Sequence, residues 1–357
     1  GATLGTAAAL HVIGGLFAFA AVFWTIQLVR PDDAQARLVG VILGAALLFK
    51  VSDVAEYWFE AKVQSKYVVW ARNSALLTIA AVKIVLILLQ APLIAFAWAM
   101  FAETALAASA VAAAFAIRGP PLRDLGARQR RARSLLKDSW PLIPAGLAIS
   151  GYMTIDQIML GQMIGDTAVG IYSAATRLSV IWYFIPAAVV ASVFPALLKA
   201  KQRSESLYYE RLQRLCDLMV ILALTVAIPM TFLSEQIVMF LFGPAYEGSG
   251  AVLAIHIWAS VFVFVGLAGG RWYLAENRQI LTLQRTVVGF LLNVLLNLAL
   301  IPGYGVLGAA IATIVSQGFV GLLFDAVQRE TRSLFLIKIR ALNVFDSIRR
   351  MFLRSSL

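Results

Sequence analysis

The sequence predicts an all-α polytopic membrane protein with about ten transmembrane helices arranged in two lobes. Hydrophobic residues make up 61% of the 357-residue chain and charged residues only 14%, which is far from the composition of a soluble domain. Apolar stretches of roughly 20 residues or more recur along the chain, and each can cross a hydrocarbon core of about 30 Å as a helix. One long basic stretch, 118–139, separates four of these stretches from the other six.

A hydropathy window of about 19 residues marks the individual spans. They cover residues 3–28, 38–59, 68–89, 92–117, 140–164, 169–198, 215–242, 250–274, 281–301 and 306–327. Helices are expected because hydrocarbon offers no partners to unpaired backbone groups, and the sequence does not show the alternating pattern of a membrane barrel.

The positive charges are distributed unevenly between the two sides of these spans. Most of the 30 lysines and arginines fall in alternate connections, for example at Lys62, Arg130, Lys201 and Arg278. Such a bias places these connections in the cytoplasm. The formal net charge of +11 therefore indicates membrane topology, and we expect no nucleic-acid partner.

The same pattern divides the chain into four parts. Residues 1–117 form a partial N-terminal lobe of four helices, and 140–330 form a C-terminal lobe of six. The basic segment 118–139 is either a solvated cytoplasmic linker or a binding site for anionic lipid headgroups. The tail, 331–357, suits a basic amphipathic cytoplasmic helix on the inner leaflet, with a frayed end as the alternative.

One predicted hairpin, 140–201, carries a charge in each of its two spans. Asp156 and Arg177 lie almost symmetrically about the turn at 165–168, at about 12–15 Å from the outer end for a rise of about 1.5 Å per residue. A charge at this depth is costly unless it is paired or faces a watery cavity. Arg177 either binds a substrate anion or forms a static ion pair with Asp156.

Five further charges of interest lie in the second to fourth spans. Lys50 and Asp53 share one face of the second span with Glu56, since residues on a helix are spaced by about 100°. This face either lines a cavity or is neutralised by a local Lys50–Asp53 pair. Lys83 and Glu103 either pair with each other or line a cavity as well.

The remaining polar residues of the second lobe have a structural and a functional interpretation. Asn293 and Asn297 are one helical turn apart and share a face, where they line a cavity or form interhelical hydrogen bonds. His256 fits a hydrogen-bonded structural residue. We expect Asp217 and Asp325 at the cytoplasmic interface because they lie close to helix ends.

Several kinds of chemistry find no support in the sequence. The single Cys216 excludes a disulfide framework and a cysteine metal cluster, and His11 and His256 are too far apart to read as a metal pair. No phosphate-binding Gly-Lys-Ser/Thr motif occurs, and little sequence remains for a soluble catalytic domain. We therefore expect no catalytic residue, metal or cofactor, and no enzyme.

Two stretches carry a family resemblance. Residues 139–201, with the run MTIDQIMLGQMIGDTAVGIYSAATRLSVIWYFIPAAV, resemble the seventh and eighth helices of Wzx-type polysaccharide-biosynthesis flippases, which translocate O-antigen repeat units of lipopolysaccharide. Residues 293–317, NVLLNLALIPGYGVLGAAIATIVSQ, resemble the eleventh and twelfth helices of the wider multidrug/oligosaccharidyl-lipid/polysaccharide exporter superfamily. Members have at least twelve helices around a central cavity, so the chain is expected to lack the first two. Its start at Gly1 looks like a truncation.

The resemblance implies a function and a set of site residues. A flippase of this kind moves an oligosaccharide on undecaprenyl diphosphate from the cytoplasmic to the periplasmic leaflet of the bacterial inner membrane by alternating access. The expected substrate-binding residues are Arg177, Lys50, Lys83, Asn293 and Asn297, and the expected ion-coupling residues, for a proton or sodium ion, are Asp156, Glu103 and Asp53. Membrane lipids are expected partners. The alternatives are a cation-coupled drug exporter and a peptidoglycan-precursor flippase of the same superfamily.

Overall fold

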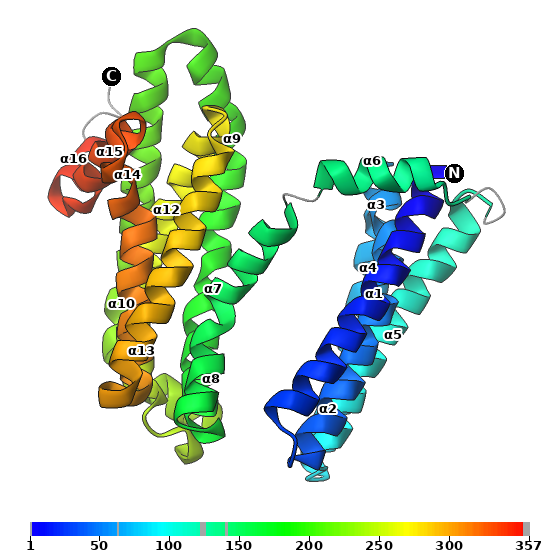
Figure 1. Cartoon of the computed structure of the whole chain (residues 1–357). Coiled ribbons are helices and arrows are strands. Elements are labelled where there is room, and N and C mark those ends of the chain that lie inside the picture. The colour runs from blue at the N-terminus through cyan, green and yellow to red at the C-terminus, as the bar shows by residue number, and fades with distance from the viewer. Residues whose placement is uncertain (1, 63, 122–125, 140–141, 353–357) are drawn as a thin grey trace. The chain divides into compact units, whose positions relative to one another are not determined.

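The chain is an all-α polytopic membrane protein, as predicted. The computed structural model describes residues 2–62, 64–121, 126–139 and 142–352, and within these ranges it contains helices and no strand. Eight helical segments are long and apolar enough to cross a membrane. The chain divides into two compact units, Gly1–Pro141 and Leu142–Leu357 (Figure 1). Trp140, where the hairpin is predicted to begin, and the tail residues 353–357 lie outside the described residues.

The first unit contains four membrane spans and one surface helix. Its helices are α1 (Ala2–Val29), α2 (Ala34–Ala45), a 3₁₀ segment η1 (Ala46–Ser52), α3 (Asp53–Ala61), α4 (Lys66–Leu88), α5 (Leu93–Arg118) and α6 (Gln129–Ser139). The predicted second span is thus α2, η1 and α3 in succession. Asp33 begins it, since the Asp33 side chain accepts a hydrogen bond from the Ala36 amide at 2.8 Å and satisfies one of the free donors of a helix start.

An aromatic cluster packs the helices of this unit together around the end of α3 and the start of α4. Phe59 is completely buried, and its ring lies 5.7 Å from that of Tyr67 and 6.5 Å from that of Phe115. The predicted linker is partly helical, because its second half forms α6, and the Arg128 amide donates to Thr6 on α1 at 3.0 Å. Residues 122–125 of that linker are not among those described.

The second unit is a bundle of long helices with two short helices at its C-terminal end. Its elements are α7 (Leu142–Met163), α8 (Asp166–Val180), η3 (Ile181–Tyr183), α9 (Phe184–Arg203), α10 (Glu205–Phe242), η4 (Pro244–Tyr246), α11 (Ser249–His256), α12 (Ala259–Ala275), α13 (Gln279–Gly318), a π-helical turn η5 (Phe319–Leu323), α14 (Phe324–Val327), η6 (Arg329–Thr331), α15 (Arg332–Leu342) and α16 (Val344–Phe352).

The predicted spans 281–301 and 306–327 lie in one helical run that reverses at Gly305. Gly305 has φ 57° and ψ −134°, a conformation that glycine adopts far more readily than other residues. The run therefore consists of a first arm before Gly305 and a second arm after it. The arms lie side by side, since Asn293 on the first donates to Ser316 on the second at 3.3 Å.

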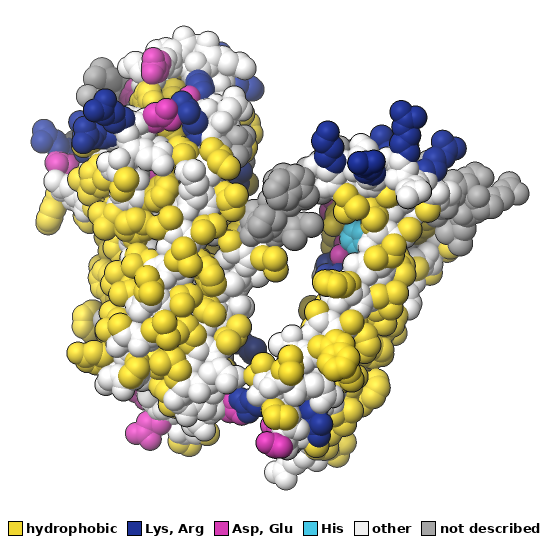
Figure 2. Space-filling model, in the orientation of Figure 1, with side chains coloured by type: hydrophobic (Ala, Val, Ile, Leu, Met, Phe, Trp, Pro, Cys, Tyr) yellow, Lys and Arg dark blue, Asp and Glu magenta, His cyan; other side chains and the backbone are white. Residues whose placement is uncertain are grey.

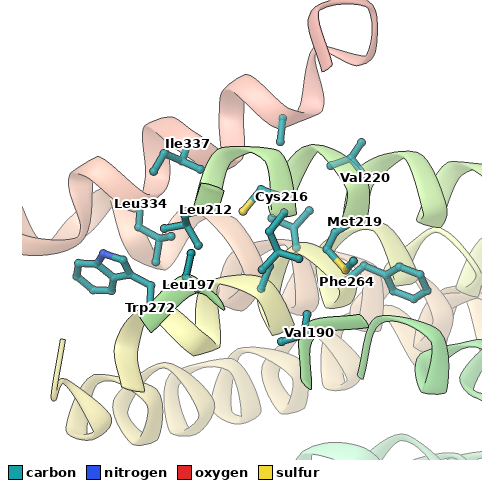
Figure 3. Close-up of a cluster of buried hydrophobic side chains, with 14 of the residues drawn as sticks. Val190, Leu197, Leu212, Cys216, Met219, Val220, Phe264, Trp272, Leu334 and Ile337 are labelled. Atoms are coloured by element: carbon teal, nitrogen blue, oxygen red, sulfur yellow. The ribbon is translucent and has the colours of Figure 1, made fainter. Parts of the chain in front are cut away.

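Apolar side chains form the core of the second unit and also cover its flanks. Leu212, Cys216 and Met219 on α10 are completely buried and pack with Phe264 and other residues of one cluster (Figure 3). On the flanks, hydrophobic side chains dominate, while Lys and Arg gather at the end that carries α15 and α16 (Figure 2). This distribution fits a surface in contact with lipid and one polar end.

The C-terminal helices differ from the expectation of an amphipathic helix that lies only on the membrane. Lys338 on α15 is completely buried, and its Nζ lies 2.5 Å from a carboxylate oxygen of Asp325. Arg350 on α16 donates twice to Asp217, at 2.8 Å each. Asp217 and Asp325 have no exposed surface, because the C-terminal helices cover them, and their expected depth at the cytoplasmic interface stays a prediction.

Candidate functional site

Asp156 lies in the interior of the second unit and is held by three donors. Its side chain is 6% exposed. The hydroxyl groups of Tyr172 and Thr313 each donate to Oδ2 at 2.8 Å, and the Asn297 amide donates to Oδ1 at 2.5 Å. These donors come from α8 and from both arms of α13. The carboxylate therefore joins four helical segments that are distant in sequence.

The network continues from Asp156 along the two arms of α13. Asn297 also donates to Asn293 at 3.0 Å, and both Asn293 and Tyr152 donate to Ser316 at 3.3 Å. The prediction that the two asparagines share a face and bond between helices is confirmed. Their predicted role in binding substrate stays a prediction, because both side chains are buried.

One oxygen in this network has no donor. Oδ1 of Asn297 is buried and accepts no hydrogen bond from any described residue, although the amide group of the same side chain bonds to Asp156. A buried acceptor without a partner costs free energy of about 1–3 kcal/mol. Oδ1 of Asn297 and the carboxylate of Asp156 are oxygen atoms of the kind that bind a hard cation. They could equally accept a hydrogen bond from a protonated group.

His256 borders this network and has the structural role expected from the sequence. Its Nδ1 lies 2.9 Å from the Ser179 hydroxyl, and its ring meets that of Tyr172 edge-on at 6.0 Å. Its side chain is buried. His256 thus packs against the residue that bonds to Asp156 and supports the position of that residue.

Arg177 does not pair with Asp156. Its side chain is exposed, and among the described carboxylates none forms an ion pair with it. The reason lies in the helix: Tyr172, which reaches Asp156, and Arg177 are five residues apart and point about 140° away from each other around α8. The static pair is therefore wrong, and the binding of a substrate anion stays a prediction.

The charged face of the second span is neutralised within the first unit. Lys50 pairs with Asp53 at 3.6 Å, as the local interpretation predicts. Arg72 forms a second set of ion pairs, with Glu56 at 2.6 Å and with Asp53 at 3.4 Å. Arg72 lies in α4, within the predicted third span. These residues and Glu103 line a cavity of about 310 Å³.

Lys83 and Glu103 form the pair that the sequence allows. Lys83 Nζ on α4 lies 2.7 Å from a carboxylate oxygen of Glu103 on α5. Lys50 and Lys83 therefore both have a carboxylate partner in the first unit, whereas Arg177 lies in the second.

The hydroxyl groups that hold Asp156 are not among the site residues predicted from the sequence. They are uncharged polar groups on otherwise apolar helices, whereas the prediction was based on charged residues and amides; the residues concerned are Tyr172, Thr313 and Ser316. Thr313 and Ser316 are three residues apart and so share a helix face, a signal available in the sequence. The described residues contain no group of three or more His, Cys, Asp or Glu side chains placed to hold a metal ion.

Comparison with known proteins gives relatives of one kind. Over 191 residues the chain is 26% identical to a protein of Haloferax volcanii named "Probable low-salt glycan biosynthesis flippase Agl15", covering 52% of this chain and 40% of that protein. It is 29% identical over 178 residues to "Probable flippase AglR" of the same organism, covering 48% and 37%. A third relative, 25% identical over 170 residues, is "Capsular polysaccharide biosynthesis protein CapF" of Staphylococcus aureus, covering 47% and 43%. The matched part spans about two-fifths of each relative.

Solved structures show the same fold. An inward-facing multidrug resistance transporter of the MATE family, in the MOP superfamily, aligns over 99% of this chain and 87% of its own with a TM-score of 0.71 and 11% identity. A MOP superfamily transporter from Pyrococcus furiosus aligns over 98% and 79% with a TM-score of 0.60 and 12% identity. At such identity the likeness establishes the fold alone. The sequence family is given by a model described as "Polysaccharide biosynthesis protein", which matches residues 4–201, more than half of the chain. The chain belongs to this polysaccharide biosynthesis protein family.

Proposed function

We propose that this protein is a flippase that moves a lipid-linked oligosaccharide repeat unit across the membrane. The substrate we propose is an oligosaccharide on undecaprenyl diphosphate, as in O-antigen assembly, moved from the cytoplasmic to the periplasmic leaflet of a bacterial inner membrane. Support comes from the family match and from three relatives named for flippases or for capsular polysaccharide synthesis. The role is transport, and no chemical step on the substrate is proposed.

The observation that carries the mechanism is the bonding of Asp156 to two helix arms and α8. Its carboxylate accepts two hydrogen bonds at Oδ2 and one at Oδ1. When Asp156 takes up a proton, or a cation displaces a donor, at least one of the bonds to Tyr172, Thr313 or Asn297 must be lost. Loading of Asp156 by a proton or sodium ion would thereby alter the packing of α7 against both arms of α13. We propose this as the coupling step of alternating access.

For the substrate, Arg177 is the strongest of the predicted cations. Its charge is permanent and its planar fork suits the oxygens of a diphosphate. Lys50 and Lys83 already have carboxylate partners, so they would have to exchange Asp53 and Glu103 for the substrate. We therefore propose Arg177 as the primary contact, and we propose Glu103 and Asp53 as groups that take back the lysines when the substrate leaves.

Complementation in a bacterial strain without its own repeat-unit flippase tests the proposal. Expression of the protein should restore surface polysaccharide and deplete lipid-linked repeat units from the cytoplasmic leaflet. The Asp156→Asn variant should fail at equal membrane abundance, while Asp346→Asn, an exposed change on α16, should complement normally. Repeat units that stay in the cytoplasmic leaflet, with export of cationic drugs instead, would support the drug-exporter alternative.

A further inference from the structure

A second cluster of buried charges lies at the end of the second unit that carries α15 and α16. Asp325 on α14 is its centre. Lys338 Nζ lies 2.5 Å from Oδ2 of Asp325 and donates to the carbonyl oxygen of Gly321 at 2.7 Å. The Tyr273 hydroxyl donates to Oδ1 of the same carboxylate. Lys338, Asp325 and Tyr273 have no exposed surface.

The helices around this cluster are shaped to admit the lysine. A Cβ atom at Gly269 on α12 would lie 2.5 Å from Cε and Nζ of Lys338, a distance that real Cβ contacts do not show. Gly321 lies in the π-helical turn η5, where the backbone bonding of an α-helix is altered and Gly321 accepts the bond from Lys338. The backbone at Gly269 and Gly321 therefore leaves space for Lys338 and binds it in the position where it pairs with Asp325.

Arg285 is a half-buried cation beside this cluster, and two of its nitrogen atoms have no acceptor among the described residues. It lies on the first arm of α13, and its guanidinium carbon is 5.0 Å from the centre of the Tyr273 ring. The carboxylate of Asp325, which accepts a hydrogen bond from Tyr273, is already paired with Lys338, and no described carboxylate forms an ion pair with Arg285. Nε and Nη1 of Arg285 are buried and find no acceptor among the described residues. Buried donor groups without an acceptor are costly, and each calls for an explanation such as a ligand or a functional role.

Arg285 lies on the same helix as Asn293 and Asn297, two residues of the hydrogen-bond network around Asp156. Arg285, Gly289, Asn293 and Asn297 follow one another at intervals of four residues on α13, so each is the neighbour of the next in a row that winds around the helix. Asn297 at one end of this row bonds to Asp156. At a rise of about 1.5 Å per residue, Arg285 lies roughly 18 Å along the helix from Asn297, toward the end at which α15 and α16 lie.

We propose that Arg285 binds the diphosphate of the lipid carrier, and that Lys338 keeps Arg285 available by occupying Asp325. This proposal rests on the proposed flippase function, for which it adds a binding residue that the sequence places among the cytoplasmic loop cations. The stack on Tyr273 holds the guanidinium in one orientation before the anion arrives, which lowers the ordering cost of binding. The ligand chemistry is that of a prenyl diphosphate.

The test measures binding of farnesyl diphosphate, a short prenyl diphosphate, to the whole chain in lipid nanodiscs by calorimetry, with farnesol as the probe without phosphate. Arg285→Gln should weaken binding of the diphosphate about tenfold or more, since a charge-assisted hydrogen bond is lost, and leave farnesol unaffected. Arg278→Gln is the matched control, because Arg278 already pairs with Glu330 at 2.7 Å, and it should bind as the unchanged protein does.

Lys338 is tested by rescue. In Lys338→Met the free Asp325 should attract Arg285, so diphosphate affinity should fall although Arg285 is present. The double variant Lys338→Met/Asp325→Asn removes both charges and should restore affinity, which a purely structural role of Lys338 does not predict. Unchanged affinity in Arg285→Gln, or equal losses in Arg278→Gln, would overturn the proposal.

Failure of this proposal and failure of the flippase function give different results. If Arg285→Gln binds farnesyl diphosphate normally while the unchanged protein complements a flippase-deficient strain, only the Arg285 proposal falls. If Arg285-dependent binding is found but the unchanged protein does not complement, the flippase function falls and the anion site stands.

Discussion

Asn297 on the first arm of α13 donates a 2.5 Å hydrogen bond to Asp156 on α7, a residue 141 positions earlier in the chain. The same carboxylate accepts a bond from Thr313 on the second arm. A single ionisable group thus connects three stretches of chain inside a membrane protein. In such a setting an ionisable group is usually functional, and this relationship gives the first prediction.

Replacement of Asp156 by Asn should abolish ion coupling while the fold is kept. The two side chains have nearly the same shape, and the amide oxygen can still accept from Tyr172 and Thr313. Transport in proteoliposomes should fall about tenfold or more and lose its dependence on an imposed proton or sodium gradient. Gradient-driven transport at the normal rate in Asp156→Asn would show that the coupling group is elsewhere.

Arg177→Ala should abolish surface polysaccharide without lowering membrane abundance. Arg177 is exposed and has no carboxylate partner among the described residues, so its removal should change stability by no more than about 0.5 kcal/mol. Arg214→Ala serves as control, since Arg214 is an equally exposed cation that pairs with Glu210 one turn away. Normal polymer at the cell surface in Arg177→Ala would exclude its role.

Because Arg177 and Asp156 are not paired, their replacements should act independently. The double variant Arg177→Ala/Asp156→Asn should show the sum of the two single losses, expressed as free energies. Transport assays on all four proteins of this cycle measure the interaction. Partial recovery of activity in the double variant would mean that the two residues form an ion pair during transport.

Lys83 and Glu103 form an ion pair, so the effects of replacing them on the free energy of unfolding should depend on each other. Removal of one partner leaves a charge unpaired between α4 and α5, so Lys83→Met should lower the stability of the solubilised protein by about 1–3 kcal/mol. In Lys83→Met/Glu103→Gln no unpaired charge remains, and most of this loss should be recovered. Thermal unfolding followed by fluorescence checks both. Equal losses in the single and the double variant would contradict the argument.

The buried lysine predicts a dependence of stability on alkaline pH. Burial lowers the pKa of Lys338 below its usual 10.5, although Asp325 favours the charged form. Between the folded pKa and 10.5 the unfolded chain binds more protons, so stability increases as pH rises through this range. The unfolding temperature should therefore rise more steeply with alkaline pH in the unchanged protein than in Lys338→Met/Asp325→Asn.

Local features of the sequence predicted the spans and part of the candidate site. Hydropathy placed the helices, and the four-residue spacing of Asn293 and Asn297 predicted their shared face. The contact between Asn297 and Asp156 could not be predicted, because it depends on how α7 packs against α13, which spacing along either helix does not determine. The hydroxyl groups of Tyr172 and Thr313 escaped notice because uncharged polar residues are common in membrane helices.

The spacing of residues in α15 indicates that Lys338 is buried, but the usual preference of lysine for solvent pointed the other way. Lys338 lies four residues after Leu334 and three before Ala341, both completely buried, so helical spacing alone assigns Lys338 to the buried face. A lysine suggests solvent or headgroups, and that preference led to the expectation of an outward-facing charge. The acceptor that makes its burial tolerable, Asp325, lies on a different helix and is not evident from local sequence.

The reversal at Gly305 links the behaviour of the two arms of α13. Asn297 and Thr313 stand on opposite sides of this bend and both bond to Asp156, so the carboxylate fastens the two arms in addition to the direct bond between Asn293 and Ser316. Under the coupling step proposed above, neutralising the Asp156 carboxylate would remove one of the ties between the arms. An ion gradient across the bilayer would then act on the distance between two helices that are neighbours in the chain.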